Sequence, residues 1–133
     1  MVEQPAVPGV QQVPEEQPES APVATLPVPL HTPLWTYVFL AINVLIWLAM
    51  TLAGGSQDVR VLVRFGAKFQ PLIVQGEYWR LLTASFIHIG LLHLLMNAYA
   101  LSIFGVHVEG RFGRLRFFLL YLLSGLAGTA LSY

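Results

Sequence analysis

The chain has 133 residues, of which 56% are hydrophobic and only 11% are charged. Soluble domains carry about 25% charged residues, so this composition excludes an ordinary soluble domain and predicts a membrane protein. Seven acidic and seven basic side chains cancel, which points away from nucleic acid, and the absence of cysteine excludes disulfides, cysteine-ligated zinc and a cysteine nucleophile.

Residues 1–33 have a composition unlike the rest of the chain. They contain eight of the nine prolines and four of the seven acidic residues, whereas every Lys and Arg lies between Arg60 and Arg116. Proline lacks a backbone donor and interrupts helices, and a segment with this composition cannot bury enough apolar surface to fold. We therefore expect a disordered Pro-rich tail.

The first predicted membrane span covers residues 34–53, which are twenty uncharged residues. A helix of this length is about 30 Å long, the thickness of a hydrocarbon core. Asn43 is its one amide side chain, and we expect it to form a hydrogen bond with a neighbouring helix. Residues 54–80 mix basic and apolar side chains, and Gly66, Pro71 and Gly76 divide the segment into short pieces. This pattern favours a loop at the membrane interface.

Two further spans are predicted, at about residues 81–107 and 117–133, because both segments lack Asp, Glu, Lys and Arg. In the third, Ser124, Gly128 and Ser132 recur every four residues with Gly125 and Thr129 alongside, so this face favours close packing against another helix. Because that span reaches the last residue, we expect the chain to be part of a longer protein.

The second predicted span contains three strongly polar side chains: His88, His93 and Asn97. His93 and Asn97 are four residues apart and lie on one helical face. His88 would lie about 180° from Asn97 on a continuous helix, or in the turn before the helix if Gly90 marks its start, so it need not share their site. Such residues in a span are usually functional. Four interpretations are open: structural hydrogen bonds, metal or haem ligation, a proton or ion pathway, and donors to a developing oxyanion.

The order of residues in this part of the chain resembles the rhomboid family of intramembrane serine proteases. The similar stretches are GEYWRLLT at residues 76–83, His88-x4-His93-x3-Asn97, the turn with Gly105, Glu109, Arg111 and Gly113, and YLLSG at 121–125. The resemblance implies a rhomboid-like helical bundle, all α and polytopic, of which residues 34–133 are the first three transmembrane helices.

The resemblance also implies roles for individual residues. His93 and Asn97 would donate to the oxyanion hole, and His88 would support the site. Trp79 and Arg80 would fix the first loop, for which plain interfacial anchoring is the alternative. Glu109 and Arg111 would join a structural network at the turn.

In this family a serine and a histidine on later helices form the catalytic dyad, and the Gly-x-Ser-Gly nucleophile motif does not occur in these 133 residues. The sequence therefore predicts the N-terminal part of a serine endopeptidase that is inactive alone, uses no cofactor or metal, and cleaves membrane-anchored proteins once the remaining helices are present. The alternative is a non-catalytic relative that binds client helices. The family topology implies a bacterial cytoplasmic membrane with a cytoplasmic tail.

Overall fold

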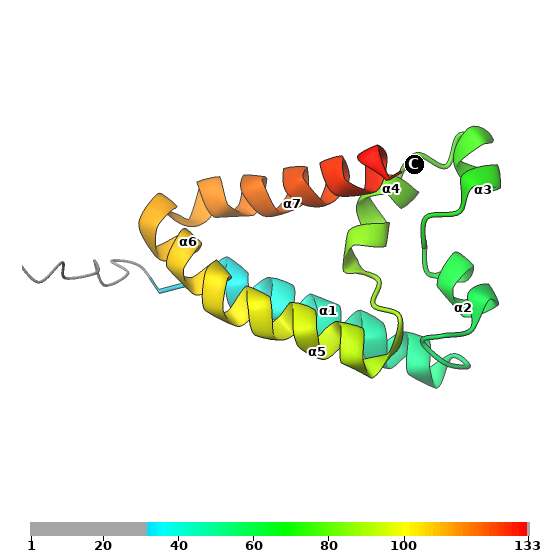
Figure 1. Cartoon of the computed structure of the whole chain (residues 1–133), viewed down its shortest axis with the longest axis horizontal. Coiled ribbons are helices and arrows are strands. Elements are labelled where there is room, and N and C mark those ends of the chain that lie inside the picture. The colour runs from blue at the N-terminus through cyan, green and yellow to red at the C-terminus, as the bar shows by residue number, and fades with distance from the viewer. Residues whose placement is uncertain (1–31, 133) are drawn as a thin grey trace, which may run out of the picture.

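A computed structural model describes residues 32–132 (Figure 1). These residues form helices and connecting loops, with no strand among them. The elements in chain order are α1 (Leu34–Leu52), α2 (Val59–Arg64), α3 (Gln70–Val74), α4 (Arg80–Thr83), the 3-10 turn η1 (Ala84–Phe86), α5 (Gly90–Ala100), the π turn η2 (Leu101–Gly105), α6 (Val106–Phe112) and α7 (Arg114–Leu131). The tail expected to be disordered lies, except for residues 32 and 33, outside the described part.

Three helical segments are long and apolar enough to cross a membrane: Leu34–Leu52, Gly90–Phe112 and Arg114–Leu131. The second consists of α5, η2 and α6, which follow one another without a break. At about 1.5 Å per residue, each segment is close to the thickness of the hydrocarbon core. The expectation of an all-α, multi-pass membrane protein is confirmed.

The second span does not begin at Leu81, as the hydropathy pattern suggested, but at Gly90. Residues 81–89 instead form most of α4, the turn η1 and an extended link. Gly90 has a φ of +79°, and a Cβ atom there would lie 2.7 Å from Nε2 of Gln57. The close approach of Gln57 and the left-handed backbone fix the helix start at this glycine.

The elements enclose a triangular frame, which Figure 1 shows from its open face. Helices α1 and α5 run side by side along one edge, and α7 diverges from them after the turn at Gly113, whose φ is +84°. Helix α4 and η1 close the third edge against the C-terminal half of α7. The helices α2 and α3 lie beyond that edge.

Aromatic side chains join α1 to α7 at the narrow corner of the frame. The Phe39 ring stacks on Tyr121 with centroids 3.9 Å apart, and the Trp35 ring is 4.5 Å from Phe118. At the other end of α1, a small core formed by Met50, Val61, Leu62 and Ile87 attaches α2 to the spanning helix. Burial of these side chains provides the main stabilisation of both corners.

The small residues of α7 provide the close contact that their spacing predicted. Gly125 and Thr129 form it with the third edge: a Cβ atom on Gly125 would lie 2.7 Å from Ser85 Oγ, and the Thr129 hydroxyl donates to the Leu81 carbonyl. Gly128 has no atom near its Cβ position. The contact with α4 and η1 therefore runs along Gly125 and Thr129 rather than along Gly128.

Candidate functional site

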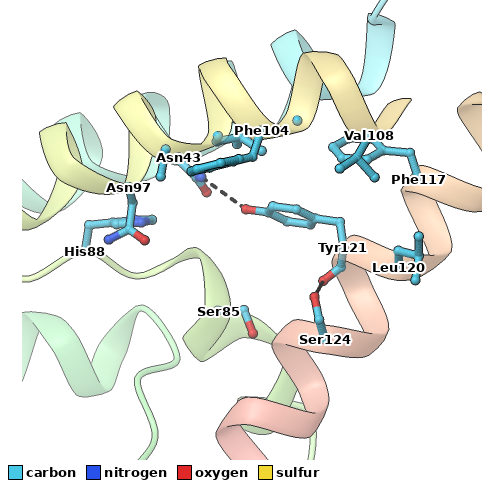
Figure 2. A pocket seen from close by; sticks show the side chains of 13 residues that line it. Asn43, Ser85, His88, Asn97, Phe104, Val108, Phe117, Leu120, Tyr121 and Ser124 are labelled. Atoms are coloured by element: carbon cyan, nitrogen blue, oxygen red, sulfur yellow. Dashed lines mark hydrogen bonds between the residues drawn. The ribbon is translucent and has the colours of Figure 1, made fainter. Parts of the chain in front are cut away.

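A cavity of about 400 Å³ lies inside the frame, between α1, the second span and α7 (Figure 2). Its wall is mainly apolar but carries six polar side chains. These are Asn43, Ser85, His88, Asn97, Tyr121 and Ser124. A largely apolar pocket with a few converging polar groups is the usual form of a binding or catalytic site.

The structure brings His88 to the same region as His93 and Asn97. His88 precedes α5 and is buried, with Nδ1 3.1 Å from the Phe86 carbonyl oxygen. Its ring centroid is 5.3 Å from that of His93. His88 and Asn97 line the cavity, whereas His93 packs beside His88 and is not part of the cavity wall. The extended link before Gly90 makes this grouping feasible, because a continuous helix would turn His88 away from Asn97.

The Asn97 side chain lies along its own helix. Its Nδ2 atom donates to the His93 carbonyl oxygen at 2.9 Å, which fixes the orientation of the amide. Because an amide nitrogen carries two hydrogens, one remains for a group inside the cavity.

Polar atoms without partners also line the cavity. Asn43 Nδ2 donates to the Tyr121 hydroxyl at 3.2 Å, so the hydrogen bond expected between Asn43 and another helix is confirmed. Asn43 Oδ1 and Ser85 Oγ are buried and have no protein partner. Buried polar atoms without a partner favour the binding of a molecule that can form hydrogen bonds with them. Neither Ser85 nor Tyr121 was predicted to line a site, although Tyr121 is the first residue of the YLLSG stretch that carries part of the family resemblance.

Glu109 is fully buried and bonds to the first turn of α1. One carboxylate oxygen accepts from the Trp35 amide at 2.9 Å, and the other accepts from the Thr36 amide and hydroxyl, each at 2.8 Å. The first amides of a helix lack partners within it and carry a partial positive charge. Glu109 therefore acts as an N-terminal cap for α1, supplied from the far end of the second span.

Close packing around Thr36 brings Glu109 within reach of the start of α1. A Cβ atom on Gly105 would lie 2.9 Å from the Thr36 side chain, so only glycine allows η2 and α1 to approach this closely. Arg111 is exposed and forms no ion pair with Glu109. The network expected at the turn is thus built from Glu109 and α1, without Arg111.

Arg80 has a similar role at the opposite end of the frame. Its side chain is 6% exposed and donates to the Val63 and Ala67 carbonyl oxygens at 2.7 and 3.3 Å and to Glu77 at 2.7 Å. Trp79 is half exposed and lies under the Arg80 guanidinium, 4.6 Å from the ring centroid. Arg80 therefore links α4 to the C-terminal end of α2, which is more than interfacial anchoring.

Gly66 permits this link. Its φ is +98°, and a Cβ atom would lie 2.6 Å from the Trp79 ring and 2.7 Å from Thr83 Oγ1, which itself donates to the Gly66 carbonyl at 2.8 Å.

Among residues 32–132, no three His, Asp or Glu side chains come together in a way that could hold a metal ion.

These features define a multi-pass helical membrane protein with a mainly apolar cavity among its spans, into which a few polar side chains converge. Residues 75–133 match the rhomboid domain. The chain is 45% identical over 101 residues to the Bacillus subtilis (strain 168) rhomboid protease GluP, an alignment that covers 76% of this chain and 20% of GluP. It is 46% identical over 72 residues to the mitochondrial RHOMBOID-like protein 6 of Arabidopsis thaliana, covering 53% of this chain and 24% of that protein.

A third relative, the inactive RHOMBOID-like protein 8 of Arabidopsis thaliana, is 39% identical over 64 residues, which cover 48% of this chain and 18% of the relative. No solved structure matches. The chain belongs to the rhomboid family. It spans about a fifth to a quarter of the length of the relatives named here.

Proposed function

We propose that this chain is the N-terminal part of a rhomboid-type intramembrane serine endopeptidase that cleaves membrane-anchored proteins. The observation that carries the proposal is the cavity wall, where Asn97 presents a fixed amide beside His88 and His93 in a membrane-embedded setting. The name of the relative GluP as a rhomboid protease supports it. The serine nucleophile and the histidine base would come from outside residues 1–133.

In this reaction the serine hydroxyl attacks the peptide carbonyl carbon while the histidine base takes its proton. Negative charge then develops on the carbonyl oxygen. The free N–H of Asn97 and a ring N–H of His93 would donate to this oxyanion. Donors that are already fixed in a water-poor site need no reorganisation as charge develops, which makes them effective.

The remaining residues would hold the donors in place. His88, bonded to the Phe86 carbonyl, would limit the orientation of the adjacent His93 ring. Glu109 and Arg80 would maintain the two ends of the frame around the cavity. Residues 54–80 would lie at the outer membrane interface and the tail in the cytoplasm of a bacterium.

The second candidate is a non-catalytic rhomboid-like protein that binds client helices. The unpaired Asn43 and Ser85 oxygens favour it, because a client helix with polar side chains would satisfy them inside the membrane. The relative described as an inactive RHOMBOID-like protein is consistent with this class.

Cleavage of a membrane-anchored reporter by the full-length protein separates the two candidates. We expect labelling by a fluorophosphonate probe, reporter cleavage, and a loss of about 10²–10³-fold in kcat for Asn97→Ala. Ser102→Ala is the matched control, because Ser102 lies on the same span, is exposed and bonds only to the Tyr99 carbonyl. No labelling and no cleavage, with tight binding of client helices, would exclude the protease and favour the second candidate.

A further inference from the structure

Three arginines gather where the second span turns into α7. Arg111, Arg114 and Arg116 are all exposed, and the exposed side chains Phe112 and Leu115 lie between them in the sequence. We call this group of arginines the arginine corner; Figure 1 shows its position at the turn from α6 to α7. The ion pairs within residues 32–132 join Arg60 to Asp58 and Arg80 to Glu77, so no carboxylate of the described part pairs with the corner.

The carboxylate nearest in sequence cannot neutralise these arginines. Glu109 is fully buried, and both of its oxygens accept hydrogen bonds from α1. In addition, Arg114 and Arg116 occupy the first turn of α7, which holds no acidic residue and no capping side chain. Cations at the positive end of a helix dipole are unfavourable, so a bound anion would lower the energy of this corner.

The sequence N-terminal to α1 contains an anionic segment. Within residues 1–33, Glu15, Glu16 and Glu19 fall in five consecutive positions, and the segment has no Lys or Arg. We propose that this acidic segment, residues 14–20, binds the arginine corner through carboxylate–guanidinium pairs. Three acidic and three basic side chains give complementary charge without a residual excess on either side.

The attachment of the tail makes this contact local. The tail joins α1 at its N-terminus, where the Trp35 amide bonds to Glu109, two residues before Arg111. The Trp35 ring also packs against Phe118, two residues beyond Arg116. Tail and corner therefore lie on the same side of the membrane whichever way the protein is inserted.

The connecting length also allows the contact. Thirteen residues, 21–33, lie between Ser20 and Leu34. At about 3.1 Å per residue, a Pro-rich linker of that length can reach about 40 Å, and the covalent link raises the effective concentration of its end near the corner. Single exposed ion pairs are weak and are screened by salt, so the contact depends on three adjacent pairs together with the tether.

Distances between spin labels in the full-length protein test the proposal. Residues 1–133 contain no cysteine, so Gln17→Cys and Leu115→Cys provide two labelling sites once any cysteine beyond Tyr133 is replaced. In nanodiscs of neutral phosphatidylcholine at about 50 mM salt, we expect a short-distance population that is lost at about 0.5 M salt. Glu15→Gln, Glu16→Gln and Glu19→Gln together should abolish it, while Glu3→Gln should not.

Arginine variants provide the matched comparison. Arg114→Gln with Arg116→Gln should remove most of the short-distance population, whereas Arg60→Gln with Arg64→Gln, at the other end of the frame, should leave it unchanged. A distribution that is insensitive to salt and to the tail substitutions overturns the proposal. Loss of the short distances when phosphatidylglycerol is added would also overturn it and would assign the corner to lipid phosphate.

Discussion

Glu109 and Arg80 are buried charged side chains at opposite ends of the frame, and both bond mainly to backbone atoms. Glu109 accepts from the amides at the start of α1, while Arg80 donates to carbonyl oxygens at and beyond the end of α2. Helix starts expose amides and helix ends expose carbonyls, so each charge matches the terminus that it contacts.

The two sites differ in their access to water. Glu109 is completely buried and has no cation beside it, so the backbone of α1 and the Thr36 hydroxyl replace its whole hydration shell. Arg80 has a charged partner, Glu77, whose side chain is 37% exposed. Water can therefore reach the Arg80 site when the side chain is removed, but not the Glu109 site. Removal of the Glu109 side chain should therefore lower the free energy of unfolding more than removal of the Arg80 side chain.

The largest effect is expected for Glu109→Ala. It leaves the Trp35 and Thr36 amides and the Thr36 hydroxyl buried without an acceptor, so the free energy of unfolding should fall by about 3–5 kcal/mol. Reversible unfolding of the full-length protein in mixed micelles, followed by tryptophan fluorescence, measures this. Arg111→Ala is the control and should change stability by less than about 0.5 kcal/mol. Equal effects of the two substitutions would contradict the capping role.

A smaller effect is expected for Arg80→Ala, about 1.5–3 kcal/mol, because the carbonyls of Val63 and Ala67 lose a charged donor but gain access to water. Hydrogen exchange should show faster opening of residues 59–74 with little change in α1 or α7. Arg64→Ala, an exposed arginine in the same loop, serves as the control. If Arg80→Ala destabilises the protein more than Glu109→Ala, the ranking of the two sites by burial is wrong.

The smallest effect concerns Asp58, which caps α2 and whose side chain is partly exposed to solvent. Hydrogen bonds from the Arg60 and Val61 amides lower the pKa of its carboxyl below the ordinary value. A lowered pKa means that the cap stabilises α2 above about pH 4 and that this contribution is lost as the pH falls through the lowered pKa. Exchange of the Arg60 and Val61 amides, corrected for intrinsic rates, should rise only in that acidic range. Asp58→Asn should keep protection without the pH dependence.

The sequence was sufficient for the class of fold and offered Gly90 as a possible helix start, but its hydropathy pattern placed the start of the second span near residue 81. Residues 81–107 are uncharged, and hydropathy indicates that a segment prefers an apolar environment. It does not indicate whether the segment is one continuous helix. The interruption before Gly90 depends on contact with Gln57, which lies 33 positions earlier in the chain. The sequence alone gives no sign of that contact.

The same limit applies to the site. The family resemblance implied a structural network at the turn that includes Glu109 and Arg111, both of which are recognisable in a sequence by their side-chain charge. The actual partners of Glu109 are backbone amides, which every residue except proline carries and which therefore leave no signature. The grouping of His88 with Asn97 likewise depends on the link before Gly90 rather than on their spacing.

The π turn η2 determines the direction in which Glu109 points. A π turn accommodates one extra residue, and each residue advances an α-helix by about 100°. If residues 97–109 formed a regular α-helix, Glu109 would point about 120° away from Asn97 around the helix axis, whereas with the π turn the difference is about 20°. The π turn thus brings Asn97 and Glu109 close to one face of a continuous segment, from which Asn97 lines the cavity and Glu109 reaches α1.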